Sequence, residues 1–172
     1  MENQPIHFDP EFQTFTYGDP NHPKRKLGTL NKGDLLVFYA GLEGFDFVSQ
    51  PALYLIGYFE VEMAGMASSF TPSQISTHFS QNFHVRHQSL FAQQVNHLVL
   101  VKGAEGSRLF QKAHLFSETQ IVPGKPPLKV ISPQMRDIFG HFNNRYSFQR
   151  NPTRWVDPAY VNSAANFVRS LA

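Results

Sequence analysis

Two histidines lie three residues apart in the densest polar stretch of the sequence. They are His84 and His87, with Arg86 between them, inside residues 82–87. Imidazole can ligate a metal or exchange a proton near neutral pH, so this spacing permits a metal pair or an acid–base site. A metal needs a third ligand, and no acidic residue stands at a metal-motif spacing from the pair. We therefore expect no metal, and favour histidines that order a loop or hydrogen-bond a ligand.

Arginine, amide and aromatic residues alternate in a second stretch, residues 143–155. It contains Arg145, Arg150 and Arg154, followed by Trp155, the only tryptophan of the chain. Arginine forks suit phosphates and guanine edges, amides suit adenine edges, and aromatic rings stack on bases. This stretch therefore predicts a loop that contacts bases or phosphates. The alternative is that Trp155 fills the core beneath the last helix and the arginines are solvated.

Motifs of nucleophilic and phosphate-binding enzymes are missing from the sequence. It contains no Gly-x-Ser-x-Gly, no Gly-x-x-x-x-Gly-Lys and no dinucleotide fingerprint. Glu60 and Glu62 would share one side of a strand, but as a solvated pair they do not support hydrolysis by two carboxylates. Catalysis is therefore the weaker hypothesis, and we expect no cofactor.

Length and composition limit the kind of protein that can hold these residues. The chain has 172 residues, of which 41% are hydrophobic, 14% aromatic and 16% charged, and it has no cysteine. That length fits one domain over residues 1–172, and the composition excludes a disordered tail protein. Without cysteine there is no disulfide and no thiolate zinc site. No secretory signal begins the sequence and no apolar run is long enough to span a membrane, so we expect a cytoplasmic protein.

Charge is distributed unevenly along the chain. Residues 1–85 hold 4 Lys/Arg and 9 Asp/Glu, whereas residues 86–172 hold 11 Lys/Arg and 4 Asp/Glu. A basic half is a hint of a surface for a polyanion, since phosphate contacts supply most of the nonspecific affinity for nucleic acid. The alternative is that the two halves interleave in space and the field averages out.

Apolar runs and capping signals predict an α+β fold. We expect mostly coil and turns up to residue 33, then strands at residues 35–39, 52–61, 95–101 and 108–116. Proline after a capping residue predicts helices from Thr71, Ser132 and Asp157, the second of which ends at Gly140. The expected architecture is a small mixed or antiparallel curved sheet, or pseudo-barrel, with short helices and a C-terminal helix.

Several stretches of the sequence together resemble a known family, the third type of nucleotide-modification-associated domain. They cover most of the chain, from about residue 7 to residue 171. The stretches that carry the resemblance are His7-Phe8-Asp9-Pro10, Phe15-Thr16-Tyr17-Gly18-Asp19-Pro20, residues 33–42, 54–59, 82–87, 98–102 and 107–109, Gln149-Arg150 and Arg154-Trp155. The strand opened by Gly33-Asp34 and the strand with Ile56-Gly57 are the most telling.

That strand pair also resembles the wider PUA-like group, which includes the EVE and ASCH modules. In this group a small curved barrel holds an aromatic-lined pocket, and some members recognise modified bases. The resemblance therefore implies a binding module attached to nucleic-acid modification. In the family an N-terminal segment with a first strand and a Gly-rich turn precedes the matched stretch. This chain begins almost at His7, so we expect it to lack that element or to be a shorter form.

Our first hypothesis is a module that binds nucleic acid or a modified nucleotide. Lys102, Arg150 and Arg154 would neutralise phosphate, with Arg108 in the same set, and Tyr39 and Trp155 would stack on a base. The side chains expected to contact polar base edges are Tyr17, Asp19, His87 and Gln149. Two alternatives assign only a structural role: Tyr39 would belong to the core, and Asp19 would close a turn with Pro20.

Two rival hypotheses come from other function classes. One is an enzyme that acts on nucleotides or nucleic acid through His84 and His87. The other is a structural or partner-binding domain, a homodimer through exposed aromatic side chains. The first rival predicts activity that is lost in His87→Ala, and the second predicts a dimer without affinity for nucleic acid.

Overall fold

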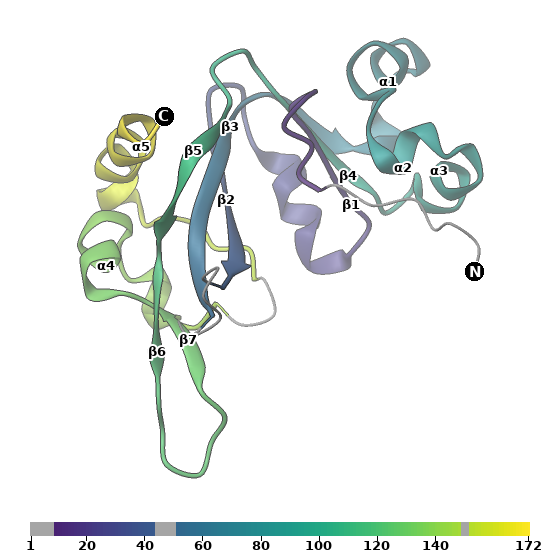
Figure 1. Ribbon diagram of the computed structural model, residues 1–172. Coiled ribbons are helices and arrows are strands. Elements are labelled where there is room, and N and C mark those ends of the chain that lie inside the picture. The colour runs from purple at the N-terminus through teal and green to yellow at the C-terminus, as the bar shows by residue number, and fades with distance from the viewer. Residues whose placement is uncertain (1–8, 44–50, 149–151) are drawn as a thin grey trace. The chain divides into compact units, whose positions relative to one another are not determined.

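The computed structural model describes residues 9–43, 51–148 and 152–172, and it confirms an α+β fold (Figure 1). The chain divides into two compact units that each combine two segments. Unit 1 holds residues 1–36 and 59–108, and unit 2 holds residues 37–58 and 109–172. The single domain over residues 1–172 stays a prediction.

In unit 1, three antiparallel strands form the sheet. Strand β1 (Thr16–Asp19) pairs with β4 (Val99–Gly103), which pairs on its other side with the second half of β3 (Ala52–Met66). The register places Gly18 opposite Leu100. Strand β4 is almost entirely apolar because it is buried on both faces, which gives a continuous rather than alternating pattern.

Short helices of unit 1 cover a small apolar core. They are η1 (His22–Thr29), η2 (Ala67–Ser69), α1 (Pro72–Phe79), α2 (Phe83–Arg86) and α3 (Gln88–Gln94). Helix α1 begins as predicted, because Thr71 and Gln74 form a reciprocal capping box before Pro72. The buried core of this region consists of Ala67, Phe79, Leu98 and Leu100.

Two sequence-based expectations in unit 1 are wrong. Residues up to 33 are not only coil, because Thr16–Asp19 forms β1 and His22–Thr29 forms η1. Strand β1 lies at the edge of the ladder, where Pro20 can follow directly without removing an inner hydrogen bond. The strand expected from Val95 begins only at Val99, since Leu98 still donates its N–H to the Gln94 carbonyl at the end of α3.

The strands of unit 2 are β2 (Leu35–Leu42), the first half of β3, β5 (Arg108–Leu115), β6 (Ser117–Gln120) and β7 (Leu128–Ile131). Strands β2 and β5 both pair with β3, while β6 and β7 form a separate antiparallel hairpin. Residues 121–127 connect the two strands of this hairpin (Figure 1). Over the described residues these ladders are open, and no closed barrel forms.

The helices of unit 2 are α4 (Pro133–Phe139), η3 (Phe142–Asn144), η4 (Pro158–Tyr160) and α5 (Val161–Ser170). Helix α4 begins after the Ser132 cap and ends at Gly140, whose φ of +83° is in the left-handed region that glycine favours. The C-terminal helix is confirmed, but the prediction that Asp157 caps it is wrong. The carboxylate of Asp157 instead accepts the His141 N–H at 3.2 Å.

Among the residues with a described placement, no helix is long and apolar enough to cross a membrane.

Candidate functional site

Polar side chains of unit 1 gather around Gly18 in strand β1. Tyr17 is buried and donates its hydroxyl to Asp19 Oδ2 at 2.9 Å. Asp19 Oδ1 accepts from both the backbone and the side-chain N–H of Asn21, at 2.7 Å each. The backbone bond to Asn21 is an Asx turn, so Asp19 does close the turn with Pro20. Its contact with a base edge stays a prediction.

Asp9 contacts the backbone of the same strand. Its Oδ1 accepts the backbone N–H of Gly18 at 3.4 Å. Burial, reinforced by the charges of Asp19 and Glu11, raises the pKa of Asp9 to about 8, against the opposing effects of the Gly18 hydrogen bond and Lys24. Asp9 is therefore a neutral carboxyl group at pH 7.

Asn82 and His84, at the start of α2, approach Gly18 closely. A Cβ atom on Gly18 would lie 2.9 Å from Asn82 Oδ1 and 3.1 Å from His84 Cδ2. Only glycine leaves room for these two side chains. The Nδ1 atom of His84 lies 2.7 Å from Gln94 Oε1, and burial lowers the pKa of this imidazole, which is neutral at pH 7.

We call this group the Gly18 cluster. Lys24 belongs to it: burial lowers the pKa of its ammonium group, and the negative charge of Asp19 opposes that shift. The members of the cluster are Asp9, Tyr17, Gly18, Asp19, Lys24, Asn82 and His84. Sequence reasoning found Tyr17 and Asp19 but missed Asp9, for which the repeated Asp-Pro of residues 9–10 and 19–20 was the available signal.

His87 has different neighbours from His84. Its ring packs against Phe83, with the centroids 4.8 Å apart. Its Nε2 atom is buried and has no hydrogen-bond partner among the described residues. Among those residues there is also no group of three or more His, Asp or Glu side chains that could hold a metal.

Two predicted phosphate ligands of unit 1 bind the backbone. Lys102 donates to the Thr14 carbonyl at 2.6 Å, and burial lowers the pKa of its ammonium group. Arg108 donates to the carbonyls of Glu105 and Ser107, at 2.6 and 2.8 Å. Each of these side chains supports a loop, and a role in binding phosphate stays a prediction.

Tyr39 of unit 2 packs into an aromatic group. Its ring stacks on Phe116 at 6.1 Å and meets the edge of Phe148 at 5.5 Å. Its hydroxyl donates to the Pro152 carbonyl at 3.1 Å, and burial raises the pKa of this phenol to about 12. These contacts are the ones expected if Tyr39 belongs to the core. Stacking of Tyr39 on a base stays a prediction.

Arg154 and Trp155 have contrasting surroundings in unit 2. Arg154 donates to the Ser147 carbonyl at 3.0 Å and lies over the Phe148 ring at 5.7 Å. Trp155 is 47% exposed, so it does not fill the core as the alternative supposed. Burial, followed by the charge of Arg145, lowers the pKa of Arg154. Gln149 and Arg150 lie outside the described residues.

The loop that carries Arg145 has an unusual backbone. Phe142, Asn143 and Asn144 have φ values of 46°, 55° and 62°, a left-handed conformation that costs energy in residues other than glycine. Tyr146 supports the loop by donating to Asn144 Oδ1 at 3.0 Å. Both asparagines are exposed. We call the exposed or half-buried residues Asn143, Asn144, Arg145, Arg154 and Trp155 the Arg–Trp surface.

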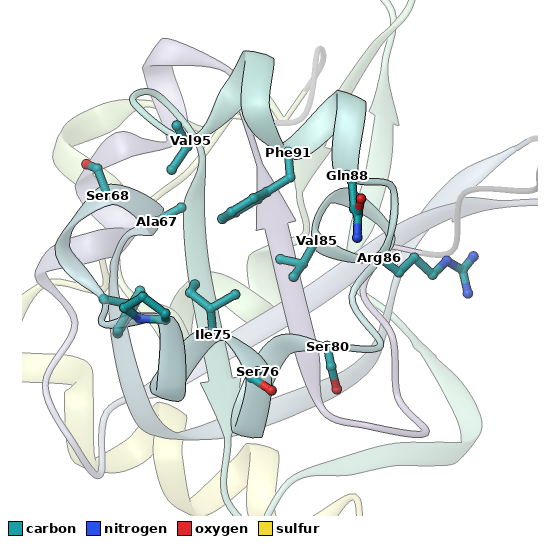
Figure 2. Close-up of a pocket in the computed structure, with 12 residues that line it drawn as sticks. Ala67, Ser68, Ile75, Ser76, Ser80, Val85, Arg86, Gln88, Phe91 and Val95 are labelled. Atoms are coloured by element: carbon teal, nitrogen blue, oxygen red, sulfur yellow. The ribbon is translucent and has the colours of Figure 1, made fainter.

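A groove of about 600 Å³ lies among the short helices of unit 1 (Figure 2). Its floor is apolar: Ile75, Phe91 and Val95 point into the same space, while the Arg86 side chain extends away from it (Figure 2). Serine hydroxyls from Ser68, Ser76 and Ser80 lie around the rim. Sequence reasoning missed this groove, because helices α2 and α3 were not predicted.

The chain was compared with known protein families, curated proteins and solved structures. Residues 1–170 match the family described as nucleotide modification associated domain 3. No curated protein and no solved structure gave a significant match. The match covers nearly the whole chain, so this protein belongs to the nucleotide modification associated domain 3 family and is associated with nucleotide modification.

Proposed function

We propose that the protein binds nucleic acid or a modified nucleotide through the Arg–Trp surface of unit 2. One observation carries this proposal: Arg154 binds the carbonyl of Ser147, two residues from the exposed Arg145 whose charge acts on it, and the following residue, Trp155, is 47% exposed. Like charges repel, and a bound phosphate relieves that repulsion. An exposed indole offers a face on which a base can stack.

The distribution of charge between the units supports the same assignment. Unit 2 contains eight Lys/Arg and five Asp/Glu, whereas unit 1 contains seven Lys/Arg and eight Asp/Glu. The positive excess of the whole chain is therefore located in the unit that carries the Arg–Trp surface. A positive surface raises both the rate and the affinity with which a polyanion binds.

The rigid support of Arg154 adds a geometric argument. One guanidinium nitrogen binds the Ser147 carbonyl, and the guanidinium group lies over the Phe148 ring. An arginine that is oriented before binding loses less conformational entropy when it binds a phosphate. Arg150 lies between these groups in sequence, and we include it and Gln149 in the binding set.

The roles of the remaining predicted residues are part of the proposal. Tyr17 and Asp19 would contact a base edge in the Gly18 cluster, and His87 would also contact a base edge. Lys102 and Arg108 would neutralise phosphate, and Tyr39 would stack on a base. We also propose a relationship with the PUA-like group, which the pairing of β2 with β3 supports without a closed barrel over the described residues. A solved structure that superposes on that group would test the relationship.

Fluorescence of Trp155 and anisotropy of labelled oligonucleotides test the binding proposal. We expect salt-sensitive binding of single- or double-stranded oligonucleotides, quenching of Trp155, and tighter binding of a strand that carries a modified base. In Arg145→Ala, the slope of log affinity against log salt should fall by about one, as for one lost phosphate contact.

Arg25→Ala is the matched control, because Arg25 is an exposed arginine of η1 in unit 1 and its removal changes the net charge equally. This control should keep the wild-type salt slope. Equal slopes for Arg145→Ala and Arg25→Ala would contradict the assignment to the Arg–Trp surface. No binding at low salt would contradict the proposed function itself.

A further inference from the structure

We propose that the hairpin of β6 and β7 enters the major groove of double-stranded DNA, where the apolar tip of the hairpin contacts thymine methyl groups. The tip consists of residues 121–127, which connect the two strands. The major groove of B-form DNA is wide enough for a two-stranded β-ribbon and exposes the C5-methyl group of thymine. The inference rests on the proposed binding of nucleic acid and names duplex DNA as the partner of this element.

The backbone of the tip forms a defined turn. The Lys125 N–H donates to the Val122 carbonyl at 3.0 Å, and Gly124 has a φ of +74°. Proline at the second position of a turn and a glycine with positive φ at the third are typical of a type II turn, and Pro123 and Gly124 occupy these positions. A tip whose backbone is ordered in advance loses less conformational entropy when it binds.

The surface of the tip is apolar and carries a positive charge. Ile121 is 78% exposed, the largest value for any large apolar side chain in the described part of the chain, and Pro123 and Pro126 are also exposed. Lys125 is exposed, and residues 119–136 contain no acidic residue. An apolar tip alone would equally suit a protein partner. The lysine and the lack of carboxylates favour a polyanion, since phosphates attract positive charge.

Strand β7 is hydrogen-bonded to the segment that supports the Arg–Trp surface. The Phe148 N–H donates to the Lys129 carbonyl at 3.1 Å, and Val130 forms an antiparallel β-bridge with Ser147. The carbonyl of the same Ser147 accepts from Arg154. The base of the hairpin is therefore fixed to the backbone that holds Arg154, so a duplex bound by this arginine lies within reach of the hairpin.

The length of the hairpin suits the depth of the groove. An extended residue spans about 3.3 Å, so the chain from Lys129 to Gly124 covers up to about 16 Å. The major groove is about 8.5 Å deep, so the tip can reach base edges while the strands pass between the phosphates. Figure 1 shows the hairpin extending beyond α4 and α5 of the same unit, which leave its tip uncovered.

Double-stranded RNA offers neither feature that the hairpin would use. The major groove of A-form RNA is deep and narrow, so side chains cannot contact its base edges. Uracil also lacks the methyl group that thymine presents in the major groove. The inference therefore predicts a preference for duplex DNA over duplex RNA, and for thymine over uracil within duplex DNA.

Three labelled duplexes of equal length test these preferences by anisotropy at low salt. They are alternating dA-dT, alternating dA-dU and alternating A-U RNA. The two DNA duplexes differ only in the thymine methyl groups, and alternation places a methyl group within reach in every register. We expect the wild type to bind dA-dT about three- to four-fold more tightly than dA-dU, as for one methyl group removed from water, and to bind the RNA more weakly than dA-dT.

Substitutions in the tip make the test specific. Ile121→Ser removes the apolar contact, so it should bind dA-dT and dA-dU equally. Leu109→Ser is the matched control, because Leu109 is a 57% exposed apolar residue of β5 outside the hairpin, and it should keep the wild-type preference. Lys125→Ala should lower the slope of log affinity against log salt by about one, as for one lost phosphate contact. Circular dichroism of each variant checks that it is folded.

The outcomes separate this inference from the proposed function. Equal affinity of the wild type for dA-dT and dA-dU, a preference that Ile121→Ser retains, or an unchanged salt slope in Lys125→Ala would each overturn the inference alone. Tighter binding of the RNA duplex or binding of single strands only would do the same. A wild-type dimer in light scattering that Ile121→Ser dissociates would assign the tip to a second copy of the chain and overturn the inference. Failure to bind any nucleic acid at low salt would overturn both.

Discussion

The Gly18 cluster and the Arg–Trp surface handle charge in opposite ways. In the cluster, burial and neighbouring carboxylates keep Asp9 neutral, and Asp19 is satisfied by three hydrogen bonds from Tyr17 and Asn21. At the surface, the charge of Arg145 acts on Arg154, whose guanidinium lies over the buried ring of Phe148. Protonation thus governs the first region, and ionic strength governs the second.

This difference shows how one small chain places two kinds of ionisable group in different surroundings. Under the proposed function, the arginines of the Arg–Trp surface would attract a polyanion, and salt would weaken that attraction. A half-buried neutral acid depends instead on hydrogen bonds with its neighbours, because burial removes much of its contact with water. A substitution or a change of pH or salt that affects one region should leave the other unchanged.

The largest expected effect concerns the support of the Arg–Trp surface. Phe148 is buried and contacts Tyr39, Phe116, Phe142 and Arg154. Phe148→Ala should lower the free energy of unfolding by about 3–5 kcal/mol, as for other buried phenylalanines. Urea denaturation followed by circular dichroism measures this loss.

Trp155→Ala is the comparison for that variant, since an exposed side chain away from the core should change stability by no more than about 0.5 kcal/mol. Similar losses in the two variants would mean that Trp155 is structural and is not a binding residue.

The next effect concerns the titration of Asp9. Its pKa is about 8 in the folded protein against an ordinary value of 3.8, so between these values the folded state holds a proton that the unfolded state has released. The contribution of Asp9 to the free energy of unfolding should therefore be largest below about pH 4. It should fall as pH rises to 8, with a slope on the order of 1 kcal/mol per pH unit.

Denaturation of the wild type and of Asp9→Asn at pH 5, 6.5 and 8 checks this dependence. Asn cannot ionise, so the variant should show a flatter profile and exceed the wild type in stability at pH 8. Parallel profiles for the two proteins would show that Asp9 is ionised in the folded state, which would remove the contrast between the regions.

The smallest effect concerns the glycine at the centre of the cluster. Gly18→Ala would place Cβ 2.9 Å from Asn82 Oδ1 and 3.2 Å from Leu100 Cδ2, so we expect overpacking of about 1–3 kcal/mol. Gly41→Ala is the matched control in strand β2, because its nearest atoms lie 3.8 and 4.0 Å away. Thermal unfolding should separate the two, and equal melting temperatures would contradict the close approach.

Much of the fold followed from local signals in the sequence. Proline after Thr71 and Ser132 located two helices, and the apolar runs at residues 35–39, 52–61 and 108–116 located strands. These signals are local because capping and strand-length apolar runs depend on neighbours in the chain. They were reliable for that reason.

The errors arose where the partner is distant in sequence or the pattern is ambiguous. Phe91, Val95 and Leu98 are spaced as on one face of a helix, but Val95 and Leu98 also belong to an apolar run of strand length. In the structure, Val95 directly follows helix α3 and packs against the core of unit 1. Asp157 has a capping sequence, but its carboxylate binds the N–H of His141.

The candidate site was predictable only in part. Tyr17, Asp19, Arg154 and Trp155 could be selected by residue type, and the structure describes all four. Asp9 could not, because its protonation depends on burial beside β1, which the sequence did not predict. For the same reason, the support that Lys102 and Arg108 give to loops was not visible before the fold was known.

The division of both units into two segments has a consequence for the order in which the chain is made. Synthesis runs from the N-terminus, so unit 1 has both of its segments once Arg108 has been added. Unit 2 is complete only after residues 109–172 have been added, although its other segment, residues 37–58, is made early. The early segment contains part of the apolar strands β2 and β3 and lacks its partner β5 during that interval. A strand edge that lacks its partner is where a nascent chain is most exposed to aggregation and to capture by chaperones.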